Sequence, residues 1–179
     1  MQNPFRHSAG FGKRIEYWIV GQMLKEGLDV YLPLVDDDGI DGVIRRRDGS
    51  FTTFQIKSRS KTVVMKDAAL FAAITHELRD NYWFIFYSER LDKMWIMTSE
   101  EFVRGAVQNK SGKNAGTRSI WFNGTRTHKE TGEPEEYVKP QWEKYLATNF
   151  DRLKTANRTA EPTLTHLVHL KRSPTPETS

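Results

Sequence analysis

Six consecutive aromatic and apolar residues, Tyr82-Trp83-Phe84-Ile85-Phe86-Tyr87, constrain the fold of this chain more than any other segment. A run of this length without a polar position is typical of a strand that is buried on both faces. The residues from Leu91 to Met97 follow after a turn near Ser88 and are predicted to form the neighbouring strand. The core is therefore expected to form around a central β-sheet.

Helical patterns flank these strands. Phe11, Ile15, Trp18, Ile19 and Met23 are three or four residues apart, which predicts a first helix with Ser8 as its cap and Gly27 at its end. Further helices are predicted over Lys66 to Arg79, after a cap at Ser99, and over Gln141 to Lys154. Short strands are expected at 30–34 and 120–122, and polar loops at 108–118 and 125–138. This order indicates a mixed α/β fold, with helices packed on a central mixed sheet.

Length and composition limit the function classes. The 179 residues suit one domain, predicted over 1–160, with a C-terminal extension over 161–179. The absence of cysteine excludes disulfides and thiolate zinc sites, so a metal would need oxygen or histidine ligands. His166 and His169 have metal-like spacing but no third ligand. No apolar signal region or membrane-length segment is present, so we expect a cytoplasmic protein without a membrane partner.

Polar residues gather around a predicted hairpin. The sequence Asp48-Gly49 is a strong hairpin turn signal between strands at 40–46 and 51–57. Gln55 and Lys57 are two residues apart on the return strand and therefore share a face. The hairpin brings them back beside Asp41, and Glu16 lies at the flank of the apolar stripe of the first helix. We therefore expect these four side chains to meet at one end of the sheet.

This combination suits metal-assisted phosphodiester hydrolysis. Carboxylate and amide oxygens are ligands for hard cations such as Mg²⁺ or Mn²⁺, so Asp41, Gln55 and Glu16 are the candidate metal ligands. Lys57 is expected to orient the attacking water or to stabilise charge on the phosphate. A basic segment follows, and its members Ser58, Arg59, Lys61 and Lys66 are the candidate nucleic-acid contacts.

The pattern resembles the PD-(D/E)XK nuclease superfamily over roughly residues 10 to 100, about half the chain. Glu16, Asp41, Gln55 and Lys57 match the helix glutamate, the strand aspartate and the acidic-or-Gln, any, Lys triplet in turn. The strings Gly39-Ile40-Asp41-Gly42 and Gln55-Ile56-Lys57-Ser58 look most like uncharacterised prokaryotic branches with Asp…Gln-x-Lys sites. Holliday-junction resolvases and transposon end-cleaving subunits are similar in outline.

The resemblance implies a restriction-endonuclease-like core and a Mg²⁺- or Mn²⁺-dependent endonuclease acting on DNA in repair, recombination or mobile-element processing. It also implies a homodimer, because a duplex has two strands to cut. Gln55 departs from the usual acidic residue, which lowers the negative charge of the pocket. An alternative is therefore a non-catalytic nucleic-acid-binding or protein-interaction module on a retained nuclease fold, and a third hypothesis is an RNA-targeting toxin.

Each candidate residue also has a structural interpretation. Asp41 follows Gly39 as a turn residue would, and Gln55 and Lys57 are compatible with the polar face of an ordinary strand. Glu16 is compatible with a helix surface, and the basic segment with solvated surface. Trp83, Trp95 and Trp121 are expected in the core rather than as platforms for base stacking.

Overall fold

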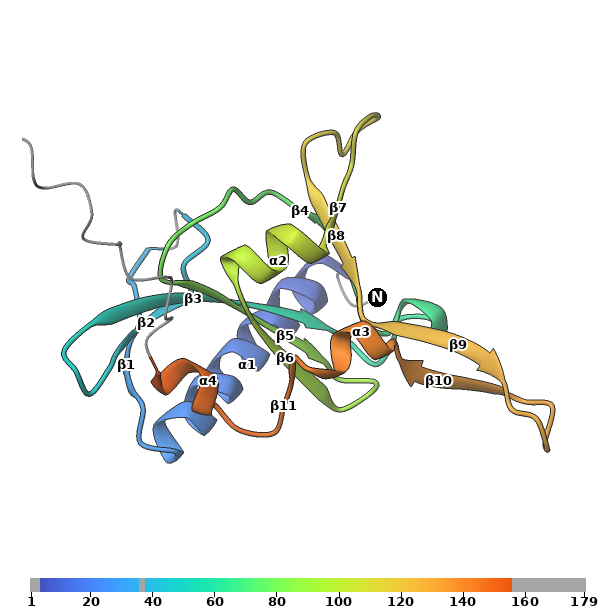
Figure 1. Ribbon diagram of the computed structural model, residues 1–179, viewed down its shortest axis with the longest axis horizontal. Coiled ribbons are helices and arrows are strands. Elements are labelled where there is room, and N and C mark those ends of the chain that lie inside the picture. The colour runs from blue at the N-terminus through green and yellow to red at the C-terminus, as the bar shows by residue number, and fades with distance from the viewer. Residues whose placement is uncertain (1–3, 36–37, 156–179) are drawn as a thin grey trace, which may run out of the picture.

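The computed structural model describes residues 4–35 and 38–155. Helix α1 (Pro4–Lys25) packs against a central sheet, and two β-hairpins of other sheets project from the body of the molecule (Figure 1). The remaining elements are, in chain order, β1 (Asp29–Tyr31), β2 (Gly42–Arg45), β3 (Phe51–Arg59), the 3₁₀ turn η1 (Met65–Asp67), β4 (Leu70–Ile74), β5 (Tyr82–Ser88), β6 (Lys93–Thr98), α2 (Ser99–Gly105), β7 (Val107–Gln108), β8 (Arg118–Trp121), β9 (Asn123–Thr127), β10 (Pro134–Val138), α3 (Pro140–Glu143), β11 (Leu146–Ala147) and α4 (Asp151–Lys154).

The central sheet has six strands in the order β1-β2-β3-β5-β6-β11. Strands β3 and β5 are parallel, with Gln55 opposite Phe84 and Lys57 opposite Phe86, and the other neighbours are antiparallel. The predicted mixed sheet flanked by helices is confirmed. The predicted turn at Asp48-Gly49 is also confirmed, because Gly49 has a φ of +84° and the Asp48 carboxylate accepts the Ser50 N–H at 2.9 Å.

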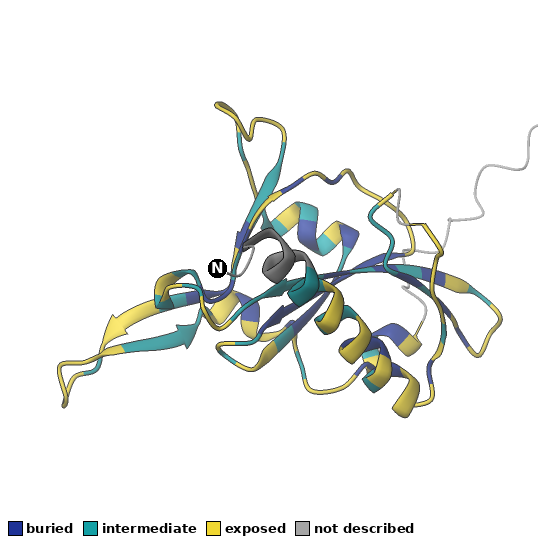
Figure 2. Cartoon of the chain, turned by 180° about the vertical axis from the view of Figure 1, so that it is seen from behind, coloured by how far each residue is buried: buried dark blue, intermediate teal, exposed yellow. Residues whose placement is uncertain are grey.

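Both faces of the sheet are covered by apolar clusters. One cluster lies between the sheet and helices α1 and α4, and it includes Ile19, Met23, Phe54, Ile56, Trp83, Ile85, Ile96 and Leu153. The other lies beneath β4, β8 and α2, and it includes Phe71, Phe84, Phe86, Trp95, Met97, Phe102 and Phe122. Every residue of β5 is buried, which confirms the prediction from the aromatic run. Burial is shown from the reverse side in Figure 2.

The helix predicted over Lys66 to Arg79 is wrong. Residues 65–67 form η1, and residues 70–74 form β4, which pairs with β8 in a second sheet of order β4-β8-β7. Ala69 is fully buried, and Phe71 pairs with Ile120 of β8, so this segment is held as a strand. Strand pairing with a segment far along the chain, and burial against the sheet, override the helical preference of the alanines.

Two predictions in the C-terminal half are also wrong. The loop expected at 125–138 is mainly the hairpin β9–β10, whose charged strands lack an apolar period. The helix expected over Gln141 to Lys154 is broken into α3, β11 and α4, because Leu146 pairs with Trp95 at the edge of the sheet. Trp142, Tyr145, Phe150 and Leu153 are nevertheless buried, whereas Leu146 is 37% exposed.

Two predicted caps and one predicted core residue are placed differently. Helix α1 continues through Ser8, and the capping box of α2 is made by Thr98 and Glu101 rather than by Ser99. Trp83 and Trp95 are buried as expected. Trp121 is 39% exposed, and Lys139 lies 4.4 Å from its ring centroid, so it is not a core residue.

Among the residues that the structure describes, no helix has the combination of length and apolar character needed to traverse a bilayer. The predicted extension over 161–179, with His166 and His169, lies outside the described ranges.

Candidate active site

Asp41 lies where β2 separates from β3. Its N–H donates to the Phe54 carbonyl at 2.9 Å, and Gly42 then begins the paired strand opposite Phe54. Two residues further along β3, the Ile56 N–H donates to Asp41 Oδ2 at 2.6 Å. The Asp41 carboxylate therefore accepts, from β3, the kind of hydrogen bond that a backbone carbonyl of β2 would accept if the pairing continued. It lies at the peptide between Gln55 and Ile56, beside the Gln-x-Lys triplet.

Gln55 and Lys57 share a face of β3, as the period of the strand requires. Phe54 and Ile56 point into the cluster beneath α1, so Gln55 and Lys57 point to the opposite side and remain partly exposed. Both line a cleft of about 430 Å³, together with Gly39. Gly39 has a φ of +66°, and a methyl group added there would lie 2.5 Å from Gln55 Nε2. The side chain of Gln55 is therefore packed against the backbone just before Asp41.

Glu16 faces a different cavity. It lines a space of about 280 Å³ with Asp41, Lys13 and Ile40. Lys13 forms an ion pair with Glu16 one turn along α1. The hydrogen bond that the Lys13 ammonium donates to Glu16 raises the pKa of Lys13; burial opposes this, and the charges of Glu16 and Asp41 add to it. The structure therefore brings Glu16 and Asp41 together around one ammonium group, and Gln55 and Lys57 together in the neighbouring cleft.

Two residues that the sequence analysis did not single out hold the segment between these cavities. The Tyr82 hydroxyl donates to the Gly39 carbonyl at 2.6 Å, and Arg79 Nη1 donates to the Asp38 carbonyl at 2.9 Å. The Arg79 guanidinium also lies 5.2 Å from the centroid of the Tyr82 ring. These contacts fix the backbone that leads into Asp41. No local sequence signal identifies them, because they join residues about 40 positions apart.

His76 also lines the cleft of Gln55 and Lys57, and the sequence analysis missed it. Its ring is 7% exposed and lies edge-on to Phe84, and Nε2 is 2.7 Å from Ser99 Oγ. Burial chiefly, with the charges of Arg79 and Arg118, lowers its pKa to about 4. His76 is therefore neutral at pH 7, and its position next to Ser99 stabilises the wall of the cleft.

The predicted nucleic-acid contacts are only partly brought together. Ser58, Arg59 and Lys61 line a third cavity, of about 660 Å³, which also includes Arg14. Lys66 lies apart in η1, where its carbonyl accepts the Trp121 indole N–H at 2.9 Å.

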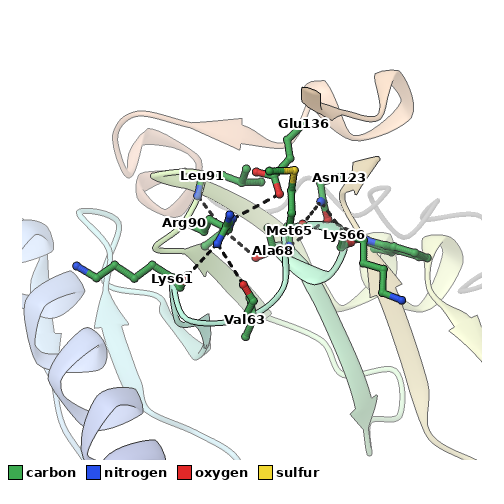
Figure 3. Close-up of polar contacts among 12 residues, drawn as sticks. Lys61, Val63, Met65, Lys66, Ala68, Arg90, Leu91, Asn123 and Glu136 are labelled. Carbon is green, nitrogen blue, oxygen red and sulfur yellow. Dashed lines mark hydrogen bonds and ion pairs between the residues drawn. The ribbon is translucent and has the colours of Figure 1, made fainter. Parts of the chain in front are cut away.

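The loop that carries Lys61 is fixed by Arg90. Its Nη1 donates to the carbonyls of Lys61 and Val63 at 3.1 and 3.2 Å (Figure 3). The side chain of Lys61 extends away from these contacts, towards α1 (Figure 3). The backbone of this basic loop is therefore held while the ammonium group is exposed.

The donor set suits a hard cation. Glu16 and Asp41 offer carboxylate oxygens to one cavity, and Gln55 offers an amide oxygen beside it. Within residues 4–35 and 38–155, no group of three or more acidic, histidine or cysteine side chains forms a metal-binding cluster. Two carboxylates alone would hold such an ion weakly and leave several of its positions to water, a coordination that Mg²⁺ commonly has.

Comparisons with known proteins bear on the fold. No protein-family model matches the chain, and no curated protein matches it. Among solved structures, a bacterial homing endonuclease, I-Ssp6803I, is similar with a TM-score of 0.51, over 78% of this chain and 86% of that chain. This chain has a nuclease-like fold. The sequence identity is 18%, so the likeness concerns the fold alone, and the roles of the site residues depend on their own geometry.

Proposed function

We propose that this chain is a metal-dependent endonuclease that hydrolyses phosphodiester bonds in DNA, with a site of the PD-(D/E)XK type. The observation that carries the proposal is the hydrogen bond from the Ile56 N–H to Asp41 Oδ2, which holds a carboxylate beside the Gln55-x-Lys57 triplet. The nuclease-like fold supports it.

In this proposal Asp41 and Glu16 hold Mg²⁺ or Mn²⁺, and Gln55 adds a neutral oxygen. When bound, the cation supplies Lewis acidity, lowering the pKa of a water molecule and offsetting charge on the phosphate. Lys57 orients the attacking water or stabilises the phosphate with its ammonium group. Arg59 and Lys61, with Ser58, contact phosphates along the neighbouring cavity, and Lys66 contacts the backbone further away.

Lys13 regulates how easily the ion binds. Its ammonium group is paired with Glu16 beside Asp41, so a divalent cation has to compete with it for the same carboxylates. Together with the neutral Gln55, this competition predicts weak metal affinity. Action on cytoplasmic DNA and assembly as a homodimer belong to the same proposal.

The test is to incubate the purified protein with plasmid, linear, single-stranded and branched DNA, with Mg²⁺, Mn²⁺ or EDTA. We expect cleavage of at least one DNA form with either metal and none with EDTA. Cleavage that is unchanged by EDTA would contradict metal dependence. Cleavage of RNA alone would favour a ribonuclease instead.

The ion pair between Lys13 and Glu16 also favours a second candidate, a non-catalytic module on a nuclease-like fold. In such a module Lys13 permanently takes the place of the cation. Calorimetry distinguishes the two, because the module should release or absorb no heat on titration with Mn²⁺ and should bind DNA equally well with and without EDTA.

A further inference from the structure

The hairpin formed by β7, β8 and their connecting loop projects from the body of the molecule (Figure 1). We refer to residues 107–121 as the basic hairpin. Every residue of its tip, 110–116, is exposed, as the reverse view also shows (Figure 2). Ile120 at its base belongs to the core, but the exposed tip buries little apolar surface, so core stability does not explain the length of the arm.

The charge of this region differs from that of the rest of the chain. The whole sequence has 27 basic and 23 acidic residues, a nearly even balance. Within the basic hairpin there is no Asp or Glu, while Lys110, Lys113 and Arg118 are basic. Lys110 and Lys113 lie at the exposed tip of the basic hairpin. An acid-free arm with a cationic tip is suited to a polyanion.

The tip is ordered by its own hydrogen bonds. The Asn109 N–H donates to the Thr117 carbonyl at 2.8 Å, and the Gly116 N–H returns a bond to the Asn109 carbonyl at 2.8 Å. The Asn109 side chain also donates to Thr117 Oγ1 at 2.8 Å. A ribbon that is already ordered loses less conformational entropy on binding than a flexible loop does.

The base of the basic hairpin belongs to the wall of the candidate site. Strand β8 pairs with β4, with Arg118 opposite Ile74. Residues 72–76 of this wall line the same cleft as Gln55 and Lys57. Arg118 Nη1 also donates to the Val103 carbonyl at 3.3 Å, which anchors β8 to α2. The cleft and the base of the basic hairpin therefore share one wall, formed by β4.

We propose that the basic hairpin enters the major groove of the duplex that the site would cut. This inference rests on the proposed function for the identity of the ligand as DNA. The major groove, about 12 Å wide, admits a two-stranded ribbon. Lys110 and Lys113 contact phosphates or guanine edges, and the exposed amides of Gln108 and Asn114 are suited to adenine.

The second projecting hairpin, β9–β10, provides a matched control. Arg126 on β9 is paired with Glu135 on β10 at 2.9 Å, and Lys129 near its tip is adjacent to Glu130. Its cations are therefore balanced within the arm. An equal loss of positive charge should weaken DNA binding less here than at the basic hairpin.

The test is fluorescence anisotropy of the full chain with a random-sequence DNA duplex in EDTA, over a range of salt concentrations. The variant is Lys110→Ala with Lys113→Ala, and the control is Arg126→Ala with Lys129→Ala. We expect the basic-hairpin variant to bind DNA at least about tenfold more weakly than the wild type. The slope of log K against log salt should also become less steep by about 1.8, as for two lost phosphate contacts. The control should change by less than about threefold, the scale of a screened surface charge.

A second arm of the test replaces the purines of the duplex with 7-deazapurines, which lack the N7 acceptor of the major groove. Weaker binding by the wild type is expected, and a smaller loss by the basic-hairpin variant, which retains only Gln108 and Asn114 to contact N7. Equal salt slopes for wild type and variant, or no binding to duplex DNA, would overturn the inference even if cleavage were observed. The expected slope change without cleavage in Mg²⁺ or Mn²⁺ would reject the nuclease proposal alone.

Discussion

Two cavities flank the segment from Asp38 to Asp41, and their side chains differ in charge. One contains the carboxylates of Glu16 and Asp41 around the ammonium group of Lys13. The other contains Lys57 and Arg79 with the neutral Gln55 and His76, and includes the exposed Asp38. A short backbone segment therefore separates a side suited to a cation from a side suited to phosphate. In the proposed function the two sides act together on one phosphodiester, and the predictions below test each side and the segment between them.

The largest effect is expected on the acidic side, at Asp41. Asp41→Asn keeps an acceptor for the Ile56 N–H but removes the charge, whereas Asp41→Ala removes both. Both should abolish Mg²⁺-dependent cleavage, by more than about 10³-fold, because metal occupancy is lost. Gel assays of cleavage and calorimetry with Mn²⁺ check this. Full cleavage activity of Asp41→Asn would show that Asp41 acts only as the acceptor for the Ile56 N–H and that its charge is not needed to hold the metal.

Lys57 tests the phosphate side. Lys57→Ala should slow cleavage by about 10²–10³-fold, as for other single electrostatic groups. Its affinity for Mn²⁺ should remain that of the wild type, because Lys57 faces the cleft and not the cavity of Glu16. Lys93→Ala is the control, since it removes an exposed lysine at the start of β6 that lines neither cavity. Loss of Mn²⁺ affinity in Lys57→Ala would contradict the separation of the two sides.

His76 adds a pH dependence on the phosphate side. Its pKa is about 4 in the folded chain and about 6.5 when unfolded, so the unfolded chain binds more protons between these values. The His76 contribution to the free energy of unfolding is therefore retained above pH 6.5 and falls by roughly 3 kcal/mol as the pH drops to 4.

Denaturant unfolding of wild type and His76→Gln at several pH values measures this contribution. The stability advantage of the wild type should shrink as the pH falls from 6.5 to 4, because only the wild type carries the titrating imidazole. His128→Gln, in the β9–β10 hairpin, is the control. A constant difference between wild type and His76→Gln would show that the pKa of His76 is not lowered.

Tyr82 tests the segment between the cavities. Tyr82→Phe removes the hydrogen bond to the Gly39 carbonyl and should cost about 1 kcal/mol of stability. Cleavage should fall several-fold because the approach to Asp41 is less well fixed. Tyr87→Phe removes a comparable bond, to Asp92, at the other end of β5 and should leave cleavage unchanged. Equal cleavage by the two variants would show that Tyr82 acts only on stability.

The smallest effects concern metal affinity. Lys13→Met should tighten Mn²⁺ binding by up to about fivefold, because the half-exposed ion pair with Glu16 contributes little free energy. Gln55→Glu should be active and also tighten binding, since it restores a charge. Calorimetry measures both. If Lys13→Met tightened Mn²⁺ binding but Gln55→Glu did not, the ion would contact the cavity of Glu16 and Asp41 and not Gln55.

Much of the central sheet follows from local sequence patterns. The aromatic run of β5, the Asp48-Gly49 turn and the stripe of α1 each have a periodicity or turn residue that needs no distant partner. The proximity of Asp41 to the Gln55-Lys57 strand follows from the same hairpin, and Ile56 N–H donating to Asp41 is consistent with it. The prediction failed at β4, where an alanine-rich segment pairs with β8.

The sequence by itself determined the residue types at the candidate site and the hairpin that carries three of them, because turn and strand period are properties of neighbouring residues. Only the tertiary structure decided that Glu16 shares a cavity with Asp41 while Gln55 and Lys57 line another. Only the tertiary structure placed Arg79, Tyr82 and His76 beside the cleft of Gln55 and Lys57. These arrangements depend on how distant segments pack across the sheet, and local periodicity carries no information about that packing.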